Sequence, residues 1–419
     1  MRTIMHIDAN SAYLSWTAVD LLERGYPLDA RTVPSAIAGD PVERRGIILT
    51  KSIPAKRCGV LTGESIRSAM RKCPSLLVFA PDYDLYMASS DAMHEILCGY
   101  SDRIERYSVD ESWIDYTGSA SAYGEAVRAA HEIKDRIKND LGFTVNIGVG
   151  PNKLLAKMAS ELKKPDMVHT LFPEELPEKL WPLPVSELFY VGRATEKKLR
   201  DLGIKTIGAL ARSNIDVIKA MLKPVHGTLV WNYANGLDET PVEPVSVLSQ
   251  KGVGNSTTTP FDVTDPEEAR LFLLALSERV AYRLRKLDSF ARVVHISIRR
   301  GDEGLTFAGK QRRLDRYIGT TDEIFDEAVR LLLMIWQGEP LRHFGVHVTE
   351  LMRADRLQTS IYDHADAGKL ARIDRAVDRI RAAYGDRAIV RGAFLHSGIG
   401  AMQGGVNEGN YLLMGGHRL

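Results

Sequence analysis

The segment SVDES, residues 108–112, places two adjacent acids, Asp110 and Glu111, between two short apolar segments. Residues 104–107 and 112–116 both have the composition of strands, so the acid pair lies at a strand-to-strand junction. Acidic residues are poor strand formers, which makes a carboxylate pair at this position unusual for a purely structural hairpin. The simpler alternative is that both acids only cap a tight turn.

A third acid, Asp8, ends the apolar segment 4–7, where a strand should pass into a helix. Three carboxylates at strand ends can converge on hard cations such as Mg²⁺, which prefer oxygen ligands. Two such ions form the arrangement used for in-line displacement at phosphorus. The pattern therefore predicts nucleotidyl transfer, provided that the fold brings the three acids together.

The composition is that of a soluble, multidomain protein. A chain of 419 residues with 44% hydrophobic and 26% charged residues predicts two to four globular domains. The sequence has no long apolar segment, no cleavable signal and an odd number of cysteines without zinc-site spacing, so we expect a cytoplasmic protein with no membrane partner. Net charge is only +1, but residues 31–72 carry nine Lys or Arg against three acids, enough for a local phosphate-binding patch.

Strand and helix patterns alternate through the first 165 residues, which predicts an α+β sheet with helices on one side. The expected elements are strands at 2–8, 104–107, 112–116 and 144–149, and helices at 11–24, 64–71, 84–98, 123–138 and 152–162, with short apolar segments at 46–51 and 76–80.

Five prolines between 165 and 185 indicate a domain boundary, followed by a helical region at 185–241. A second α+β unit with the order βαββαβ follows. Its expected elements are strand 252–259, helix 267–287, strands 291–299 and 304–308, helix 321–337 and strand 342–352. Beyond 355 we expect a basic helix at 367–384 and a glycine-rich end with too few apolar residues to pack.

Two further patterns favour phosphate binding near Asp8. The helix after Asp8 begins with unpaired N–H groups, which bind phosphate, and Tyr13 lies one turn into it, where its ring could form the floor of a sugar pocket. Lys153 and Lys157 lie four apart, on one face of their helix, and could neutralise a triphosphate. The alternatives are a core aromatic for Tyr13 and a solvated face for the lysines.

The segment 189–211 resembles a helix-hairpin-helix, in which glycine turns offer backbone N–H groups to DNA phosphates without reading bases. Gly192 and Gly203 lie at the two turns, and Arg193, Lys197 and Lys198 add positive charge.

Taken together, these features resemble the Y-family (UmuC/DinB-like, ImpB/MucB/SamB) translesion DNA polymerases over nearly the whole chain. The matching segments are DANSAY at 8–13, AKRCGV at 55–60, GESI at 63–66, PDYDLY at 81–86, SVDES at 108–112, GVGPNKLLAK at 148–157, the hairpin at 192–208 and NGLDETPV at 235–242. The resemblance implies a right-hand polymerase. Its parts would be a palm at 1–25 and 75–165, fingers at 26–74, a helix-hairpin-helix thumb at 166–240, a βαββαβ little finger at 245–352 and a tail at 353–419.

The resemblance also implies roles for single residues. Asp8, Asp110 and Glu111 would be catalytic and would bind two Mg²⁺ ions, replaceable by Mn²⁺, with the carbonyl of Ala9 as a further ligand. The nucleotide would contact Ala12, Tyr13 (as the steric gate against a 2′-hydroxyl), Lys56 and Lys153. DNA would contact Gly192, Arg193, Lys197, Gly203, Arg299 and Arg300.

The implied activity is low-fidelity, template-directed DNA synthesis. A primer 3′-hydroxyl would attack the α-phosphate of a deoxynucleoside triphosphate, in translesion synthesis, DNA repair and the SOS response. The partners implied are primer–template DNA, the nucleotide and a sliding clamp. Gln358, Ile361 and Tyr362, within QTSIY at 358–362, are similar to the short bacterial clamp-binding motif.

One position departs from the family pattern. Many relatives carry a tyrosine three residues before Lys56, where this chain has Ile53, which cannot donate a hydrogen bond. Such a bond to a charged group is worth ~1.5–3 kcal/mol, so we expect weaker nucleotide binding unless Ser52 substitutes.

Two alternatives remain open at this point. A non-catalytic accessory protein of the same fold would bind DNA and clamp, but such relatives lose the metal carboxylates, which this chain retains. A nucleotidyl cyclase would share the carboxylate-bearing palm without needing the helical thumb or the second βαββαβ unit.

Overall fold

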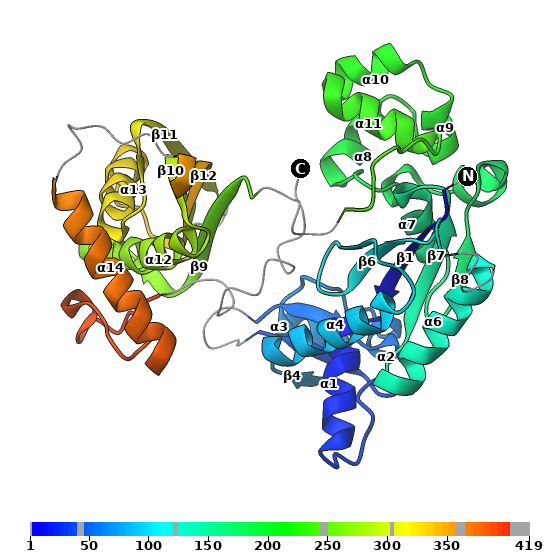
Figure 1. Ribbon diagram of the computed structural model, residues 1–419, viewed down its shortest axis with the longest axis horizontal. Helices are drawn as coiled ribbons and strands as arrows, with labels where there is room; N and C mark the ends of the chain where they lie inside the picture. The colour runs from blue at the N-terminus through cyan, green and yellow to red at the C-terminus, as the bar shows by residue number, and fades with distance from the viewer. Residues whose placement is uncertain are drawn as a thin grey trace. The chain divides into compact units, whose positions relative to one another are not determined.

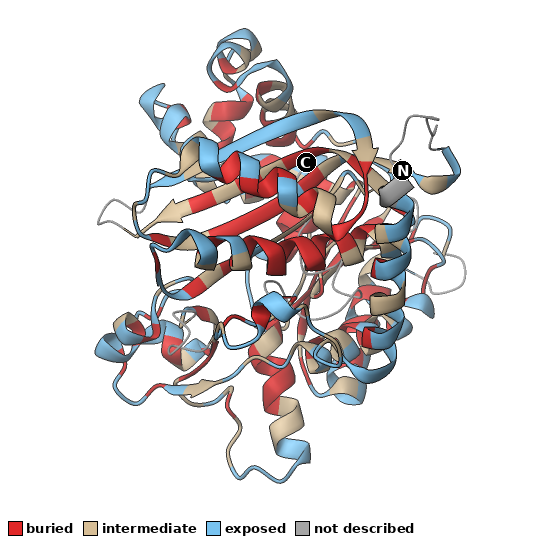
Figure 2. Cartoon of the chain, turned by 90° about the vertical axis from the view of Figure 1, so that its left-hand side faces the viewer, coloured by how far each residue is buried: buried red, intermediate tan, exposed pale blue. Residues whose placement is uncertain are grey.

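The computed structural model describes residues 2–39, 46–119, 125–243, 250–301, 306–356 and 365–402. The chain forms two compact units (Figure 1). The first contains residues 2–39 and the described residues from 47 to 243, and the second contains the described residues from 250 to 402. Buried residues follow the strands and the inward turns of the helices, whereas exposed residues dominate the loops (Figure 2). Within the described residues, no helix is both long and apolar enough to cross a membrane.

A five-stranded sheet in the order β5-β6-β1-β7-β8 forms the centre of the first unit. Strand β1 is antiparallel to both β6 and β7, and β7 is parallel to β8. The register pairs Asp8 with Glu111 on one side and with Asn146 on the other. The strands are β5 (Ile104–Arg106), β6 (Glu111–Asp115), β1 (Ile4–Ala9), β7 (Val145–Gly150) and β8 (Val168–Thr170).

Helices cover both faces of this sheet, so the expectation of helices on one side is wrong. Met5 and Ile7 point into a core with α4 (Tyr83–Cys98) and α6 (Ala126–Leu141), while His6 contacts α7 (Lys153–Glu161) on the opposite face. All of β1 is buried, because a central strand covered on both faces has no solvent side. The helix α1 (Ala12–Glu23) follows β1 directly.

Two glycines of β7 allow α7 to lie directly on the strand. A Cβ atom at Gly148 would be 1.9 Å from the carbonyl oxygen of Ala156, and one at Gly150 would be 2.9 Å from its nitrogen. Side chains at these positions would therefore displace the helix. The close approach brings the residues of α7 over Asp8 and Glu111.

We expect Gly148→Ala to lower the free energy of unfolding by at least ~3 kcal/mol, at the upper end of the range for overpacking a tight core. Gly118→Ala is the matched control, because a Cβ atom there meets nothing within 4 Å. Chemical denaturation followed by circular dichroism compares the two variants. Equal midpoints would contradict the close approach of α7 to β7.

A small sheet in the order β3-β2-β4 forms part of the region assigned to the fingers. Strand β2 (Ser35–Ala38) and helix α2 (Ile53–Arg57) were not predicted. Strand β3 (Ile48–Lys51) lies within the apolar segment 46–51, and α3 (Ile66–Lys72) overlaps the predicted helix 64–71. Strand β4 (Leu77–Phe79), which lies in the segment assigned to the palm, pairs with β2 in this sheet. Likewise β8, in the segment assigned to the thumb, belongs to the five-stranded sheet.

The helical region that follows packs around a second hydrophobic core, to which α7 also contributes side chains. Its α-helices are α8 (Arg193–Asp201), α9 (Ile207–Ala211), α10 (Ile215–Leu222) and α11 (Pro224–Ala234). Gly203, in the turn between α8 and α9, has a φ of 79°. Residues other than glycine rarely adopt this left-handed backbone conformation.

The second unit has the expected βαββαβ order, with the sheet order β11-β10-β12-β9 and helices packed in one core with it. Strand β11 was predicted at 304–308 but extends to Ile318. The prediction was too short because a charged edge strand lacks the apolar alternation that marks a buried strand. The elements are β9 (Gly252–Val263), α12 (Pro266–Lys286), β10 (Ser289–Arg300), β11 (Phe307–Ile318), α13 (Thr321–Ile335) and β12 (Leu341–Arg353).

The tail is part of this unit as far as Met402. Helix α14 (Ala365–Tyr384) is anchored by Arg285 of α12, which contacts Asp374 at 2.9 Å and Asp378 at 2.6 Å. Phe394 and Ile399 enter the core of the second unit. The expectation of an unpacked glycine-rich end is therefore wrong for residues 392–402. The clamp-like residues 358–362 lie outside the described part of the chain.

Candidate active site

Three carboxylates meet where β1, β6 and α7 come together. Oxygen atoms of Asp8, Glu111 and Glu161 all lie within 4.8 Å of one another. Asp8 is buried and Glu111 is half-buried, so their charges need partners. Carboxylate oxygens are the ligands that Mg²⁺ and Mn²⁺ prefer, so this donor set fits a hard divalent cation.

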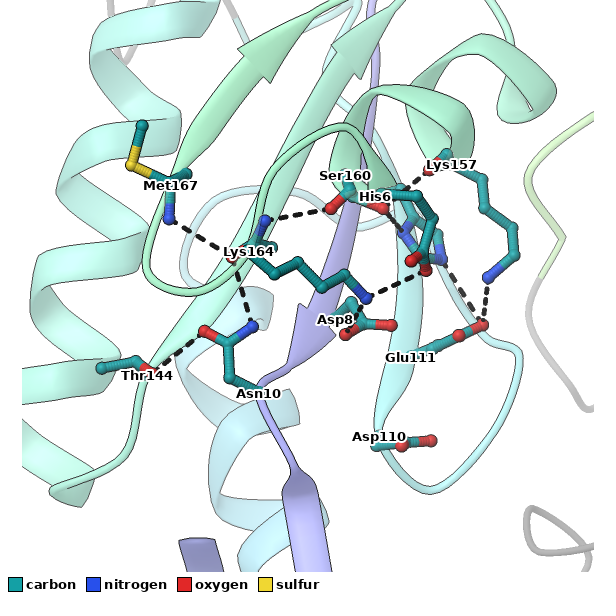
Figure 3. A network of polar contacts seen from close by, with 12 residues as sticks. His6, Asp8, Asn10, Asp110, Glu111, Thr144, Lys157, Ser160, Lys164 and Met167 are labelled. Atoms are coloured by element: carbon teal, nitrogen blue, oxygen red, sulfur yellow. Dashed lines mark hydrogen bonds and ion pairs between the residues drawn. The ribbon is translucent and has the colours of Figure 1, made fainter. Parts of the chain in front are cut away.

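Two lysines neutralise these acids in the structure (Figure 3). The ammonium group of Lys164 lies 2.9 Å from both Asp8 and Glu161, and that of Lys157 lies 2.7 Å from Glu111. Burial raises the pKa of Asp8, as do the charges of Glu111 and Glu161, whereas Lys164 opposes the rise. The site therefore has a strong requirement for positive charge.

The buried imidazole of His6 lies next to the carboxylate of Glu111. Because Ser160 Oγ donates to the carbonyl of Lys157 at 2.8 Å, it accepts a hydrogen bond from His6 Nδ1, 2.8 Å away. His6 Nε2 lies 3.6 Å from Glu111. Burial, with a contribution from Lys157, lowers the pKa of His6 to about 4, so the ring is neutral near pH 7.

Glu111 stays ionised in this environment. Burial by itself would raise the pKa of Glu111, but contacts with His6 and Lys157 outweigh burial, and the pKa lies well below its ordinary value. Since a neutral His6 carries its proton on Nδ1, we attribute the lowered pKa mainly to the charge of Lys157.

Asp110 lies at the turn beside this cluster, outside the group of three oxygens (Figure 3). Ser108 Oγ donates to its carboxylate at 2.6 Å and accepts from the backbone N–H of Glu111 at 3.1 Å, which shapes the hairpin. The N–H of Ala9 donates to the carbonyl of Asp110 at 3.0 Å and ties the hairpin to β1. Burial raises the pKa of the Asp110 carboxyl.

Tyr13 lies in the first turn of α1. Its ring stacks on Tyr86 with centroids 4.3 Å apart and meets the edge of Tyr83 at 6.2 Å. Burial raises the pKa of its hydroxyl, and the negative charge of Asp110 adds to this effect. Tyr13 is therefore packed against other aromatics and also lies within electrostatic reach of the carboxylate hairpin. Ala12, the first residue of the same helix, is buried.

The structure gives Lys153 and Lys157 different partners. Lys153 contacts both carboxylate oxygens of Glu105 at 2.7 Å and lies 4.5 Å above the ring of Trp113. The lysine that contacts Asp8 is neither of these two but Lys164, which the sequence analysis did not single out. The signal available was Glu161 three residues before Lys164, at the end of a helix already expected near the acids.

In the region assigned to the fingers, Lys56 is exposed on α2. Ser52 is buried as the N-cap of α2: its hydroxyl donates to the carbonyl of Val33 at 2.7 Å and accepts from the N–H of Ala55 at 3.1 Å. A hydroxyl committed to these bonds is not available for a nucleotide. These bonds argue against the alternative in which Ser52 substitutes for a tyrosine at Ile53, and the expectation of weaker nucleotide binding stays a prediction.

The residues expected to contact DNA are found in both units. Gly192 is the N-cap of α8, which carries Arg193 and Lys197. In the second unit, Arg300 is ion-paired with Glu339, and the guanidinium of Arg299 lies 5.8 Å above the ring of Phe307.

Comparison with known families identifies the chain. The impB/mucB/samB family profile matches residues 7–161, that of its C-terminal domain matches 250–361, and its HHH motif matches 173–204. The chain belongs to this family of Y-family DNA polymerases. DNA polymerase IV of Clostridium acetobutylicum is 41% identical over 394 residues, covering 94% of this chain and 98% of the relative. DNA polymerase IV 1 of Bacillus subtilis is 36% identical, with 94% and 93% covered.

Solved structures show the same Y-family fold. A Y-family DNA polymerase chimera, Dbh-Dpo4(243-245)-Dbh, has a TM-score of 0.71 at 21% identity, covering 84% of this chain and 99% of the chimera. DinB from Sulfolobus solfataricus has a TM-score of 0.53 at 22% identity, with 83% and 98% covered. The α+β multidomain Y-family fold is thus confirmed. This Y-family polymerase is a DNA-directed DNA polymerase of the translesion class, and the accessory-protein and cyclase alternatives fall away.

Proposed function

We propose that Asp8, Glu111 and Asp110 hold two Mg²⁺ ions, which Mn²⁺ can replace, and that Glu161 and the carbonyl of Ala9 complete the site. The observation that supports this is the convergence of carboxylate oxygens of Asp8, Glu111 and Glu161, which lie within 4.8 Å of one another. When bound, the ions stabilise charge on the transferring phosphoryl group. The reaction is attack of a primer 3′-hydroxyl on the α-phosphate of a deoxynucleoside triphosphate, which forms a phosphodiester bond, breaks the bond from the α-phosphorus to the oxygen that bridges to the β-phosphate, and releases pyrophosphate.

Lys164 and Lys56 supply positive charge to the triphosphate in this proposal. Lys164 contacts Asp8 at 2.9 Å and can exchange this carboxylate for phosphate oxygens without leaving the site. Lys153, the lysine that the resemblance assigns to the triphosphate, would first have to leave Glu105. Tyr13 lies beneath the sugar and excludes a 2′-hydroxyl.

The DNA contacts of the proposal are of the phosphate-positioning kind. Gly192 presents its backbone N–H to the primer–template duplex, and cationic side chains reinforce this contact. The N–H of Gly203 donates to the carbonyl of Arg200 at 2.9 Å, so the contribution of Gly203 to DNA binding is the tight turn that it allows. The cations are Arg193 and Lys197 on α8 and Arg299 and Arg300 on β10. Gln358, Ile361 and Tyr362 bind a sliding clamp. Free thiols at all three cysteines are compatible with a cytoplasmic location, where the enzyme serves low-fidelity DNA damage tolerance within the SOS response.

A primer-extension assay tests the proposed reaction. We expect the purified chain to add the nucleotide dictated by the template, to stop when a chelator removes divalent metal, and to resume with Mg²⁺ or Mn²⁺. Omission of the template strand is the control. Extension that persists without template or in the presence of chelator would overturn the proposal.

A further inference from the structure

Asn146 is a completely buried amide on β7 whose hydrogen bonds are all used. Its Nδ2 donates to the carbonyls of Ser160 at 3.0 Å and Lys163 at 2.6 Å. Its Oδ1 accepts from the backbone N–H of Met167 at 3.3 Å and from Asn10 Nδ2 at 3.2 Å. Two donors and two acceptor positions are the full capacity of an amide side chain, so its orientation is uniquely specified.

Asn10 extends this network at the end of β1. Its Oδ1 accepts from the backbone N–H of Asp166 at 2.9 Å. The same oxygen accepts from Thr144 Oγ1 at 3.0 Å (Figure 3). The carboxylate of Asp166 is in turn held by Lys134 at 3.0 Å and Lys138 at 2.7 Å, both on α6.

The two asparagines therefore form hydrogen bonds with the backbone of the segment 160–167 at four residues: Ser160, Lys163, Asp166 and Met167. Lys164 lies in the middle of this segment and extends to Asp8 and Glu161, 2.9 Å from each. A lysine side chain is long and flexible, so its head group is placed accurately only when its backbone is held. The bonds from Asn146 and Asn10 supply that support on both sides of Lys164.

We propose that Asn146, supported by Asn10, is a positioning residue that sets the affinity for the incoming nucleotide by holding Lys164 in the active site. Asn146 lies opposite Asp8 in the register of β1 and β7. The same strand pairing therefore positions both Asp8 and the amide that holds the backbone around Lys164, the cation that contacts Asp8. The inference rests on the proposed role of Lys164 at the triphosphate.

A double-mutant cycle tests the inference, since it measures whether Asn146 acts through Lys164. The variants are Asn146→Ala, Lys164→Ala and the double mutant, each assayed for single-nucleotide insertion on an undamaged primer–template. We expect Asn146→Ala to raise the KM for the nucleotide about 10-fold while kcat changes less than about 3-fold, because it removes binding support rather than chemistry. In the Lys164→Ala background the same substitution should change KM less than about 2-fold.

Melting temperatures separate positioning from general loss of stability. Asn235→Ala is the matched control, because Asn235 also donates to two carbonyls, those of Trp231 at 2.9 Å and Ala211 at 3.3 Å, in the helical region. We expect it to lower the melting temperature and to leave the nucleotide KM unchanged. If Asn146→Ala does not fold, Asn10→Ala takes its place in the cycle, since it removes only the outer part of the network.

Equal increases in KM in the wild-type and Lys164→Ala backgrounds would overturn the positioning role. A folded Lys164→Ala enzyme with an unchanged KM would overturn it as well, by removing the assigned role of Lys164. Either result is distinct from failure of the proposed polymerase reaction, in which the unmodified enzyme itself would not extend the primer.

Discussion

Glu111→Ala is expected to lower the turnover of primer extension by at least ~100-fold, because electrostatic stabilisation of the transferring phosphoryl group is worth several kcal/mol. Glu111 is ionised beside Lys157 and lies in register with Asp8, so its removal takes away one side of the metal site. Single-turnover insertion with saturating nucleotide and Mg²⁺ measures the loss. Near-normal turnover in a folded variant would refute the metal-site assignment.

Asp115→Asn is the matched control, because Asp115 lies on the same strand and its side chain accepts a bond from the N–H of Thr117. Asp110→Ala should cause a loss similar to that of Glu111→Ala if the hairpin carboxylate binds an ion. A loss confined to Glu111→Ala would instead restrict the site to Asp8, Glu111 and Glu161, the three acids whose oxygens already converge.

Tyr13→Ala is expected to reduce discrimination against ribonucleotides by roughly 100-fold while deoxynucleotide insertion largely persists. Removing a steric clash changes the relative binding of two substrates more than it changes the chemistry. Competition between a ribonucleotide and the matching deoxynucleotide in single-nucleotide insertion measures the ratio. A folded variant that rejects ribonucleotides as before would show that Tyr13 acts only as a core aromatic.

Two variants serve as controls for the Tyr13 experiment. Tyr13→Phe keeps the ring that stacks on Tyr86 and should retain discrimination, since the clash depends on the ring and not on the hydroxyl. Tyr83→Ala removes the edge contact to the same ring and should leave discrimination intact although the aromatic cluster is weakened. Melting temperatures show whether lost stacking alone explains any change.

Most of the elements could be predicted because their patterns are local. Strand β1, the acidic hairpin, β7 and the βαββαβ order of the second unit follow from apolar spacing and turn residues that neighbouring positions share. Strand β2 and helix α2 escaped prediction because both are short and lie among prolines and small residues. The edge strand β11 was predicted too short because its exposed positions are charged and show no apolar alternation.

The sequence by itself determined that Asp8, Asp110 and Glu111 lie at strand ends, because a strand and the turn that ends it are read from adjacent residues. Only the tertiary structure decided which lysine forms an ion pair with which acid. Lys153 and Lys157 look equivalent along their helix, yet they contact Glu105 and Glu111, and Asp8 is served by Lys164. These pairings depend on how closely α7 approaches β7 and on the amides that hold the segment after it. Both are contacts between residues distant in sequence, which no local pattern encodes.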